Sequence, residues 1–475
     1  MPEPARHRGE VAMNLPRMIQ RFRAPAIICL ALLAGAARAD DPFATSKGSW
    51  GQAYPDQWAL QRINLPATLP TTPVIVAVID SGIDFRHPDL KPETIWRNSK
   101  EVANGKDDDG NGYVDDLIGW NFLDNNNSPW DDSGHGTHTA GIIGAATGNG
   151  KGIAGVNPSV RIMPLKVMNF YGRGQSVRVA AAVYYAVANG ARVINMSLGS
   201  KGISRAEAQA IGYAIRKGVV VVAAAGNSGA DAAGFGPAGV PGVITVTATD
   251  EKDARPVYAN YGEVVDIAAP GDDVLSLRAR RTDFMMIDGP KDYRPGANVV
   301  GADKAYYRAT GTSFAAPFVS GVASLLFART PTLTGEQVRR MLLNSARDIG
   351  APGWDHLTGY GIVDASAALA ADPAFFIESR IEAVTLQQAG GKYVMRVSGT
   401  TDASAFARAW VEIGPGDDPG TWQKVVDGVK APVRDGVIGE FGIDVLRSSP
   451  KWVVRLITED RSGKRRETRY LLKVG

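Results

Sequence analysis

Between residues 74 and 370 the chain alternates short, unbroken apolar runs with longer segments of helical period. The apolar runs are rich in β-branched residues, which is typical of strands covered on both faces. We expect strands at 74–79, 161–168, 193–196, 219–224, 243–247 and 264–267. We expect helices at 135–146, 176–189, 205–217 and 313–329, and another that opens at Thr334, with Gln337 in capping-box position. This alternation predicts an α/β fold with a mostly parallel sheet, helices on both faces and ligands at the carboxyl ends of the strands.

The pattern changes after about Ala371, where short strand-like runs alternate with turns such as Gly414-Pro415-Gly416. The runs lie at 392–397, 405–413, 422–426, 441–445, 452–458 and 468–474. About a hundred residues of this texture are typical of a small β-sandwich. We therefore expect an accessory β-sandwich domain over residues 375–475.

The first 39 residues have the pattern of a signal peptide. A basic stretch at 17–23 precedes an apolar stretch at 24–37, and Ala37-Arg38-Ala39 is an A-x-A cleavage site. An uncleaved membrane anchor is the alternative, but the apolar stretch is too short to span a bilayer stably. The sequence thus predicts an exported protein that begins near Asp40, with an N-terminal arm at 40–70 and no stable membrane span after cleavage.

Composition supports export and excludes one class of partner. The formal net charge of +3 is owed to the arginines of the first 39 residues, and the rest of the chain is nearly balanced. A balanced charge gives no reason to expect nucleic-acid binding. The single cysteine, Cys29, lies in the predicted signal peptide, so we expect no disulfide in the mature chain.

An aspartate and a histidine are the first candidates for chemistry. Asp80 directly follows the strand at 74–79, although an aspartate there is more often a turn residue or a helix cap. His135 stands between two glycines, which allow close approach of the backbone to a cleft. The spacing of His135 and His138 is also found among zinc ligands, but no acidic residue stands between them. We therefore expect His135 to be a base and His138 to be structural.

A serine and an asparagine complete the set. Ser313 follows Gly311 at the start of a helix of small residues, where free backbone N–H groups favour an oxyanion. Serine is also a preferred helix N-cap, and that reading is the alternative. Asn227 lies just past the strand at 219–224, where its amide can donate a hydrogen bond, although asparagine is common in turns.

Taken together and in this order, the segments resemble the subtilisin-like serine proteases. The resemblance rests on VAVIDSGIDFRHPDL, HGTHTAG, VINMSLG, AAAGN, GTSFAAP and GYGIVDASAAL, and it extends from about Gln57 to Ala370. It implies a subtilisin-like three-layer fold, with a peptidase domain at 71–371 that cleaves proteins or peptides. It also implies a catalytic Asp80, His135 and Ser313, with Asn227 as oxyanion donor. Two edge segments would pair with an extended substrate: Gly172, Arg173 and Gly174, and Ser197, Leu198 and Gly199.

The stretch DDDGNGYVDD at 107–116 predicts a calcium site. Its spacing matches the first part of an EF-hand loop, although Ile118 stands at the position of the closing glutamate. A solvated acidic loop without a metal is the alternative. The candidate ligands are Asp107, Asp109, Asn111, Tyr113, Asp115 and Asp116. The resemblance implies a second calcium site near Asp89 and Asn149.

Two departures from the family pattern leave specificity open. Residues 40–70 are too few for the inhibitory pro-domain that many of these proteases carry. A polar insertion at 277–306 precedes Ser313, and it could cover the cleft, be cut during maturation or form a surface loop. We therefore expect an exported, calcium-stabilised serine endopeptidase, whose accessory domain could bind substrate or the cell envelope. A narrow-specificity maturation protease and a catalytically silent binding or adhesion protein are the alternatives.

Overall fold

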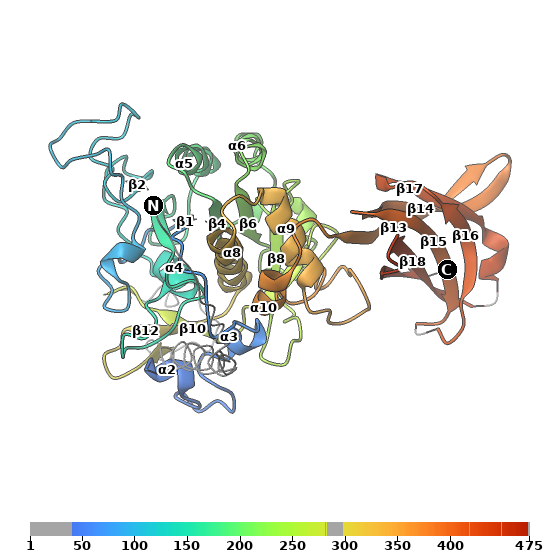
Figure 1. The fold of residues 1–475 in the computed structure, drawn as a ribbon, viewed down its shortest axis with the longest axis horizontal. Helices are drawn as coiled ribbons and strands as arrows, with labels where there is room; N and C mark the ends of the chain where they lie inside the picture. The colour runs from blue at the N-terminus through green and yellow to red at the C-terminus, as the bar shows by residue number, and fades with distance from the viewer. Residues whose placement is uncertain (1–39, 281, 283–297, 418, 448, 474–475) are drawn as a thin grey trace, which may run out of the picture.

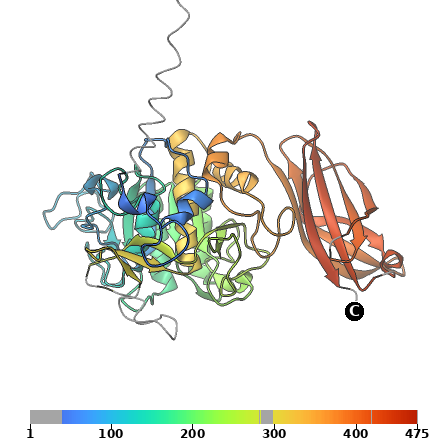
Figure 2. The same cartoon turned by 90° about the horizontal axis from the view of Figure 1, so that it is seen from below.

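A computed structural model describes residues 40–280, 282, 298–417, 419–447 and 449–473. The predicted signal peptide and most of the predicted insertion at 277–306 lie outside these residues. The chain opens with two short helices, α2 (Pro42–Thr45) and α3 (Trp58–Arg62). The rest of the described chain forms an α/β body followed by a body of β-strands (Figures 1 and 2).

The α/β body is built on a seven-stranded sheet with the order β2-β3-β1-β4-β6-β8-β9. Every neighbouring pair in it is parallel. The strands are β1 (Ile75–Asp80), β2 (Trp120–Asn121), β3 (Arg161–Lys166), β4 (Val193–Met196), β6 (Val220–Ala224), β8 (Ile244–Thr249) and β9 (Ile267–Pro270). Their carboxyl ends lie at one edge, as predicted for a ligand site.

Helices cover both faces of this sheet, so the predicted three-layer fold is confirmed. Helices α5 (Ser176–Ala188) and α6 (Arg205–Arg216) pack on one face. Helices α4 (His135–Gly144) and α8 (Thr312–Arg329) pack on the other. Helices α9 (Gly335–Ser345) and α10 (Ala365–Ala370) follow α8 in the chain. The predicted capping box of Thr334 and Gln337 is present at the start of α9.

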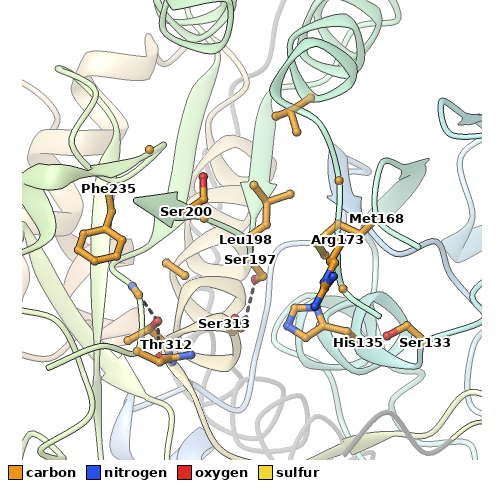
Figure 3. A pocket seen from close by; sticks show the side chains of 18 of the residues that line it. Ser133, His135, Met168, Arg173, Ser197, Leu198, Ser200, Phe235, Thr312 and Ser313 are labelled. Carbon is orange, nitrogen blue, oxygen red and sulfur yellow. Dashed lines mark hydrogen bonds between the residues drawn. The ribbon is translucent and has the colours of Figure 1, made fainter. Parts of the chain in front are cut away.

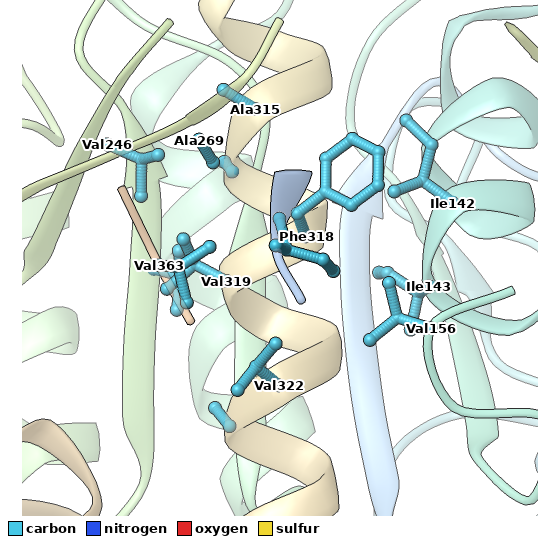
Figure 4. Packing of buried hydrophobic residues seen from close by; sticks show 14 of the residues in the cluster. Ile142, Ile143, Val156, Val246, Ala269, Ala315, Phe318, Val319, Val322 and Val363 are labelled. Atoms are coloured by element: carbon cyan, nitrogen blue, oxygen red, sulfur yellow. The ribbon is translucent and has the colours of Figure 1, made fainter. Parts of the chain in front are cut away.

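Helix α8 is the central element of the core. Figure 4 shows Phe318 directed toward Ile142 of α4, while Val319 lies near Val363. Among the described helices only α8 is long and apolar enough to cross a membrane, and 89% of that stretch is buried inside the protein. Its apolar composition is therefore explained by its place between the sheet and the surrounding helices.

Smaller sheets and 3-10 helices complete the α/β body. Strands β10 (Val274–Leu277), β11 (Val299–Val300) and β12 (Tyr306–Ala309) form an antiparallel sheet, and β5 (Ser200–Lys201) pairs with β7 (Phe235–Gly236). The 3-10 helices are η1 (Pro92–Thr94) and η2 (Ala232–Gly234). The described end of the predicted insertion thus belongs to a sheet, and Tyr306 is buried there.

The C-terminal body has two antiparallel sheets that share one apolar core, in agreement with the predicted β-sandwich. One contains β13 (Ile377–Ala389), β14 (Lys392–Ala403) and β17 (Val433–Gly442). The other contains β15 (Phe406–Pro415), β16 (Gln423–Val429), β18 (Lys451–Asp460) and β19 (Arg465–Lys473). The 3-10 helix η3 (Ile443–Leu446) follows β17.

Two predicted strands are misplaced. The strand expected at 264–267 is β9, which runs from Ile267 to Pro270. The prediction began too early because Val265 is apolar, although it belongs to a turn and not to the strand. Its backbone closes a turn with Gly262, and its side chain packs against Ala225 and Ala232. The run at 441–445 enters η3 after Gly442 instead of continuing as a strand.

Candidate active site

Four candidate residues meet at the carboxyl edge of the sheet. Asp80 ends β1, and Asn227 follows β6. His135 begins α4, and Ser313 is the second residue of α8. His135, Asn227 and Ser313 line one cleft of about 760 Å³, in which Figure 3 shows His135 and Ser313.

Asp80 and His135 form a hydrogen-bonded pair. His135 Nδ1 lies 2.8 Å from Asp80 Oδ1, which also accepts a 2.7 Å bond from the backbone N–H of Ser81. Asp80 is fully buried, while His135 keeps 16% of its side chain exposed. Burial lowers the pKa of His135, but the charge and the hydrogen bond of Asp80, with the charge of Asp131, outweigh it and raise the pKa above its ordinary value. The hydrogen bond to Asp80 fixes the orientation of the imidazole at the edge of the cleft.

A buried carboxylate organises the turn before His135. Asp131 accepts hydrogen bonds from the hydroxyls of Ser81 and Thr137 and from the backbone N–H groups of Ser133, Gly134 and Thr137. Burial raises the pKa of Asp131, although these bonds act against the increase. Asp131 was not among the sequence candidates, because its partners are recognisable only once β1 and α4 are adjacent.

Gly136 explains why small residues surround His135. A Cβ atom at this position would lie 2.1 Å from the carbonyl oxygen of Gly82 and 3.2 Å from Asp80 Oδ1. A larger residue would therefore displace α4 from the end of β1. The glycine allows the histidine to reach the buried carboxylate.

Asn227 and helix α8 are locked together by Thr312. Asn227 Oδ1 accepts 2.9 Å bonds from both the backbone N–H and the hydroxyl of Thr312. Because the amide oxygen is used in this way, the Asn227 NH₂ group is the part of the side chain that can donate to a ligand. Thr312 was also missed from the sequence, where it is an ordinary first residue of a helix.

The predicted substrate segments lie along the cleft. Gly172, Arg173 and Gly174 line it, as do Ser197, Leu198 and Gly199. Gly174 forms an antiparallel bridge with Met168. The hydroxyl of Ser197 donates a 2.6 Å bond to the carbonyl oxygen of Ser313, which ties one segment to the start of α8. None of the described residues of the predicted insertion lines this cleft.

His138 has a different environment from His135. It is fully buried, and its Nε2 donates to the carbonyl oxygens of Val274 and Tyr307, at 3.2 and 3.0 Å. Burial lowers the pKa of His138 to about 3, so the ring is neutral at physiological pH. The ring joins α4 to the sheet of β10 and β12 and does not face the cleft with His135.

The acidic loop brings three carboxylates together. Carboxylate oxygens of Glu101, Asp107 and Asp109 lie within 4.8 Å of one another. Oxygen ligands at this spacing fit a hard cation such as calcium. Glu101 was missed from the sequence because it precedes the D-x-D pattern, although an acidic residue flanking that pattern is a usable signal.

The other candidate ligands of the loop, like the three clustered carboxylates, have hydrogen-bond partners in the protein. Asn111 Oδ1 accepts from the backbone N–H of Tyr113, and Asp115 accepts from the backbone N–H groups of Asn104 and Gly105. Asp116 is fully buried, where it accepts from Asn98 and Asn111 and from the Tyr185 hydroxyl. Gly112, at the sixth position of the loop, has φ of 90°, as the sharp turn of an EF-hand loop requires.

The structure adds Asp41 to the second candidate calcium site, near Asp89 and Asn149. Asp89 and Asn149 are hydrogen bonded at 2.7 Å, and Asp41 accepts from the backbone N–H groups of Gly148 and Asn149. Burial raises the pKa of Asp89 to about 6, and the charge of Asp41 contributes to the increase. Asp41 and Asp89 are both buried, and the repulsion between their charges would be relieved by a bound cation.

Comparison with known proteins gives a consistent family assignment. The Subtilase family model (Peptidase_S8) matches residues 71–361, which are more than half of the chain. Fervidolysin from Fervidobacterium pennivorans is 36% identical over 329 residues, which are 66% of this chain and 43% of fervidolysin. Thermitase from Thermoactinomyces vulgaris is 34% identical over 278 residues, which are 58% of this chain and 82% of thermitase.

A solved structure agrees with these matches. A protease from Pseudoalteromonas arctica PAMC 21717 has a TM-score of 0.54 at 29% identity, over 70% of this chain and 98% of that protein. The aligned region spans less than half of fervidolysin, so the match concerns the α/β body more than the whole of that relative. From the family match and the fold, the chain belongs to the subtilase family.

Proposed function

We propose that the chain is a serine endopeptidase that cleaves peptide bonds of proteins through an acyl-enzyme, and that it is exported and stabilised by calcium. The observation that carries the proposal is the 2.8 Å pair of Asp80 and His135 in the cleft that also contains Ser313. Membership in the subtilase family supports it.

In the proposed mechanism His135 is the general base. Its Nδ1–H donates to Asp80, and its Nε2 takes the proton of the Ser313 hydroxyl as the oxygen attacks the scissile carbonyl. His135 then gives this proton to the leaving amine. Asp80 keeps the ring in the required tautomer and stabilises the imidazolium that forms.

The oxyanion of the tetrahedral intermediate is held by two donors, the NH₂ group of Asn227 and the backbone N–H of Ser313. The bonds from Thr312 to Asn227 Oδ1 support this role because they fix the orientation of the amide. An extended substrate pairs with the segments 172–174 and 197–199, which line the cleft.

Calcium is proposed at the acidic loop, held by Glu101, Asp107 and Asp109, and at a second site near Asp41, Asp89 and Asn149. A cation bound to the native state stabilises it by mass action. We further propose that residues 1–39 are removed as a signal peptide, and that residues 375–475 form an accessory domain that binds substrate or the cell envelope. Residues 71–371 form the peptidase domain.

The test is labelling of the purified mature protein with a fluorophosphonate serine probe, read by intact mass. We expect one adduct in the wild type and none in Ser313→Ala. Turnover of a protein substrate should fall about a million-fold in Ser313→Ala, as in subtilisin, and about a hundred- to a thousand-fold in Asn227→Ala. A folded chain that neither labels nor turns over would contradict the proposal and favour the binding-protein alternative.

A further inference from the structure

In the part of the chain that the structure describes, the cleft contains one carboxylate, that of Glu207, which has no role in the proposed mechanism. Glu207 is the third residue of α6 and keeps only 5% of its surface exposed. It nevertheless lines the same cleft as His135 and Ser313. A glutamate is rarely this buried unless it is paired or has a specific task.

Helix α6 lacks the capping box that the sequence around Glu207 predicts. Ser204 and Glu207 have the spacing of a capping box, but Ser204 makes no side-chain cap bond at the start of α6. Helix α9 shows the contrast, since its capping box of Thr334 and Gln337 is complete. Ser176, the first residue of α5, is the neighbouring group that lowers the pKa of Glu207.

Glu207 lacks a cationic partner among the described residues. Burial raises its pKa to about 7, and Ser176 acts against this increase. Two cations on the adjoining elements are turned elsewhere, because Arg178 of α5 donates to the carbonyl oxygen of Leu123 and Arg205 of α6 is exposed. The other titratable groups that line the cleft are His135, Tyr171 and Arg173.

The position of Glu207 along the cleft follows from strand pairing. Ser197 is bonded to the carbonyl oxygen of Ser313, and three residues later Ser200 pairs with Gly236. A Cβ atom on Gly236 would lie 3.5 Å from Glu207 Oε2. Because an extended chain advances about 3.3 Å per residue, Glu207 lies roughly 10 Å along this segment from the nucleophile.

We propose that Glu207 is a specificity-determining residue that receives a lysine or arginine side chain of the substrate, three or four residues from the bond that is cut. The inference rests on the proposed function. Val179 and Leu198, which line the same cleft, offer apolar surface for the methylene groups of such a side chain. The start of α6 favours the charged form of the carboxylate, and an arriving cation favours it further.

The test uses the full mature protein and a peptide library randomised at each position on both sides of one cleavable bond. At pH 8.5 we expect kcat/KM to be about ten- to a hundred-fold higher with lysine or arginine than with methionine at the position that Glu207 reads. Glu207→Gln keeps the size of the side chain and should reduce this ratio to about one, while kcat/KM for methionine peptides stays within about three-fold. Glu336→Gln, in the first turn of α9 and outside the cleft, is the matched control and should keep the ratio.

The pH dependence separates this role from a merely structural one. The preference for basic side chains should weaken in the wild type between pH 8.5 and pH 5.5, because Glu207 becomes protonated as the pH falls through about 7. The Glu207→Gln variant should show no such change in preference. An active wild type without a basic preference, or a preference that survives in Glu207→Gln, overturns the inference while the proposed protease stands. Absence of both turnover and fluorophosphonate labelling overturns both.

Discussion

At the scale of single residues, one ionisation controls the proposed chemistry. The base in the mechanism is neutral His135, and Asp80 with Asp131 raises the pKa of that histidine despite its burial. A raised pKa keeps the ring protonated to a higher pH. Asp80 and Asp131 therefore make neutral His135 a stronger base, but they also keep it protonated, and unable to accept a proton, at acidic pH.

We expect the rate of fluorophosphonate labelling to rise with pH, with a midpoint above 6.5, the ordinary pKa of histidine. Asp131→Asn, which removes one of the two charges, should move the midpoint to lower pH. Asp80→Asn should move it further and also slow the reaction, because the tautomer is no longer fixed. A wild-type midpoint at or below 6.5 would contradict this account of the site.

The sequence was sufficient to place residues whose position in the fold follows from local context, and insufficient to find those defined by distant partners. Asp80, Asn227 and Ser313 each follow a buried strand or begin a helix of small residues, so their places could be read directly. Thr312 could not, because it is recognisable only beside Asn227, and Glu101 was missed although it flanks the acidic pattern that contains Asp107 and Asp109.

At the scale of elements, close packing of α8 against its neighbours positions Ser313. A Cβ atom at Gly321 would lie 2.6 Å from the side chain of Val156. Interiors packed this closely accept extra volume only at a cost in strain. The small residues of α8 are therefore a requirement of its central position.

We expect Gly321→Ala to reduce the free energy of unfolding by about 1–3 kcal/mol, measured by denaturant titration. Gly212→Ala is the matched control, since it lies inside α6 and its new methyl group would meet only the flexible end of Arg216, at 3.2 Å. That variant should be neutral or more stable by about 0.5–1 kcal/mol. Equal losses in both variants would show that packing of α8 is not the cause.

The acidic loop gives a second test at this scale. Saturating calcium should raise the midpoint of thermal unfolding, and Asp109→Asn and Glu101→Gln should each reduce the increase, because a carboxylate of the cluster is lost. Asp108→Asn is the control, as the Asp108 carboxylate accepts from Val102 and Asn104 outside the cluster. An increase that is unchanged in both cluster variants would place the calcium elsewhere.

Element boundaries show where sequence patterns are ambiguous. The buried strands β1 and β6 were predicted nearly to the residue, because a run of β-branched residues leaves little choice. Strand β13 was missed, since Ile377–Ala389 has a polar residue at most alternate positions and only one well-covered face. The two-residue strand β2 was missed because it is too short to form a pattern.

At the scale of the whole molecule, Arg466 joins the C-terminal sheets to the α/β body. From β19 it donates to the carbonyl oxygen of Leu343 at 3.1 Å and to Asn344 Oδ1 at 2.8 Å, and it lies over the ring of Tyr360 at 4.1 Å. Burial lowers the pKa of Arg466. The two bodies are thus joined by polar and cation–π contacts of one arginine.

Arg466→Met should reduce the free energy of unfolding by about 2 kcal/mol, because it leaves the carbonyl oxygen of Leu343 without its donor. Fluorophosphonate labelling at low temperature should be retained, since the cleft is distant from this contact. Arg461→Met, at an exposed position of the same β body, should change neither quantity. A loss of labelling without a loss of stability would indicate instead that the accessory sheets influence the cleft directly.

The position of α8 also determines when the candidate site can form during synthesis and folding. A ribosome delivers Asp80, His135 and Asn227 first, and Ser313 only at the start of the helix that must then insert between α4 and the sheet. Until that insertion is complete, the nucleophile has no base beside it. Under the proposed function, a nascent or half-folded copy therefore cannot cleave neighbouring chains, because Ser313 and His135 are not yet adjacent.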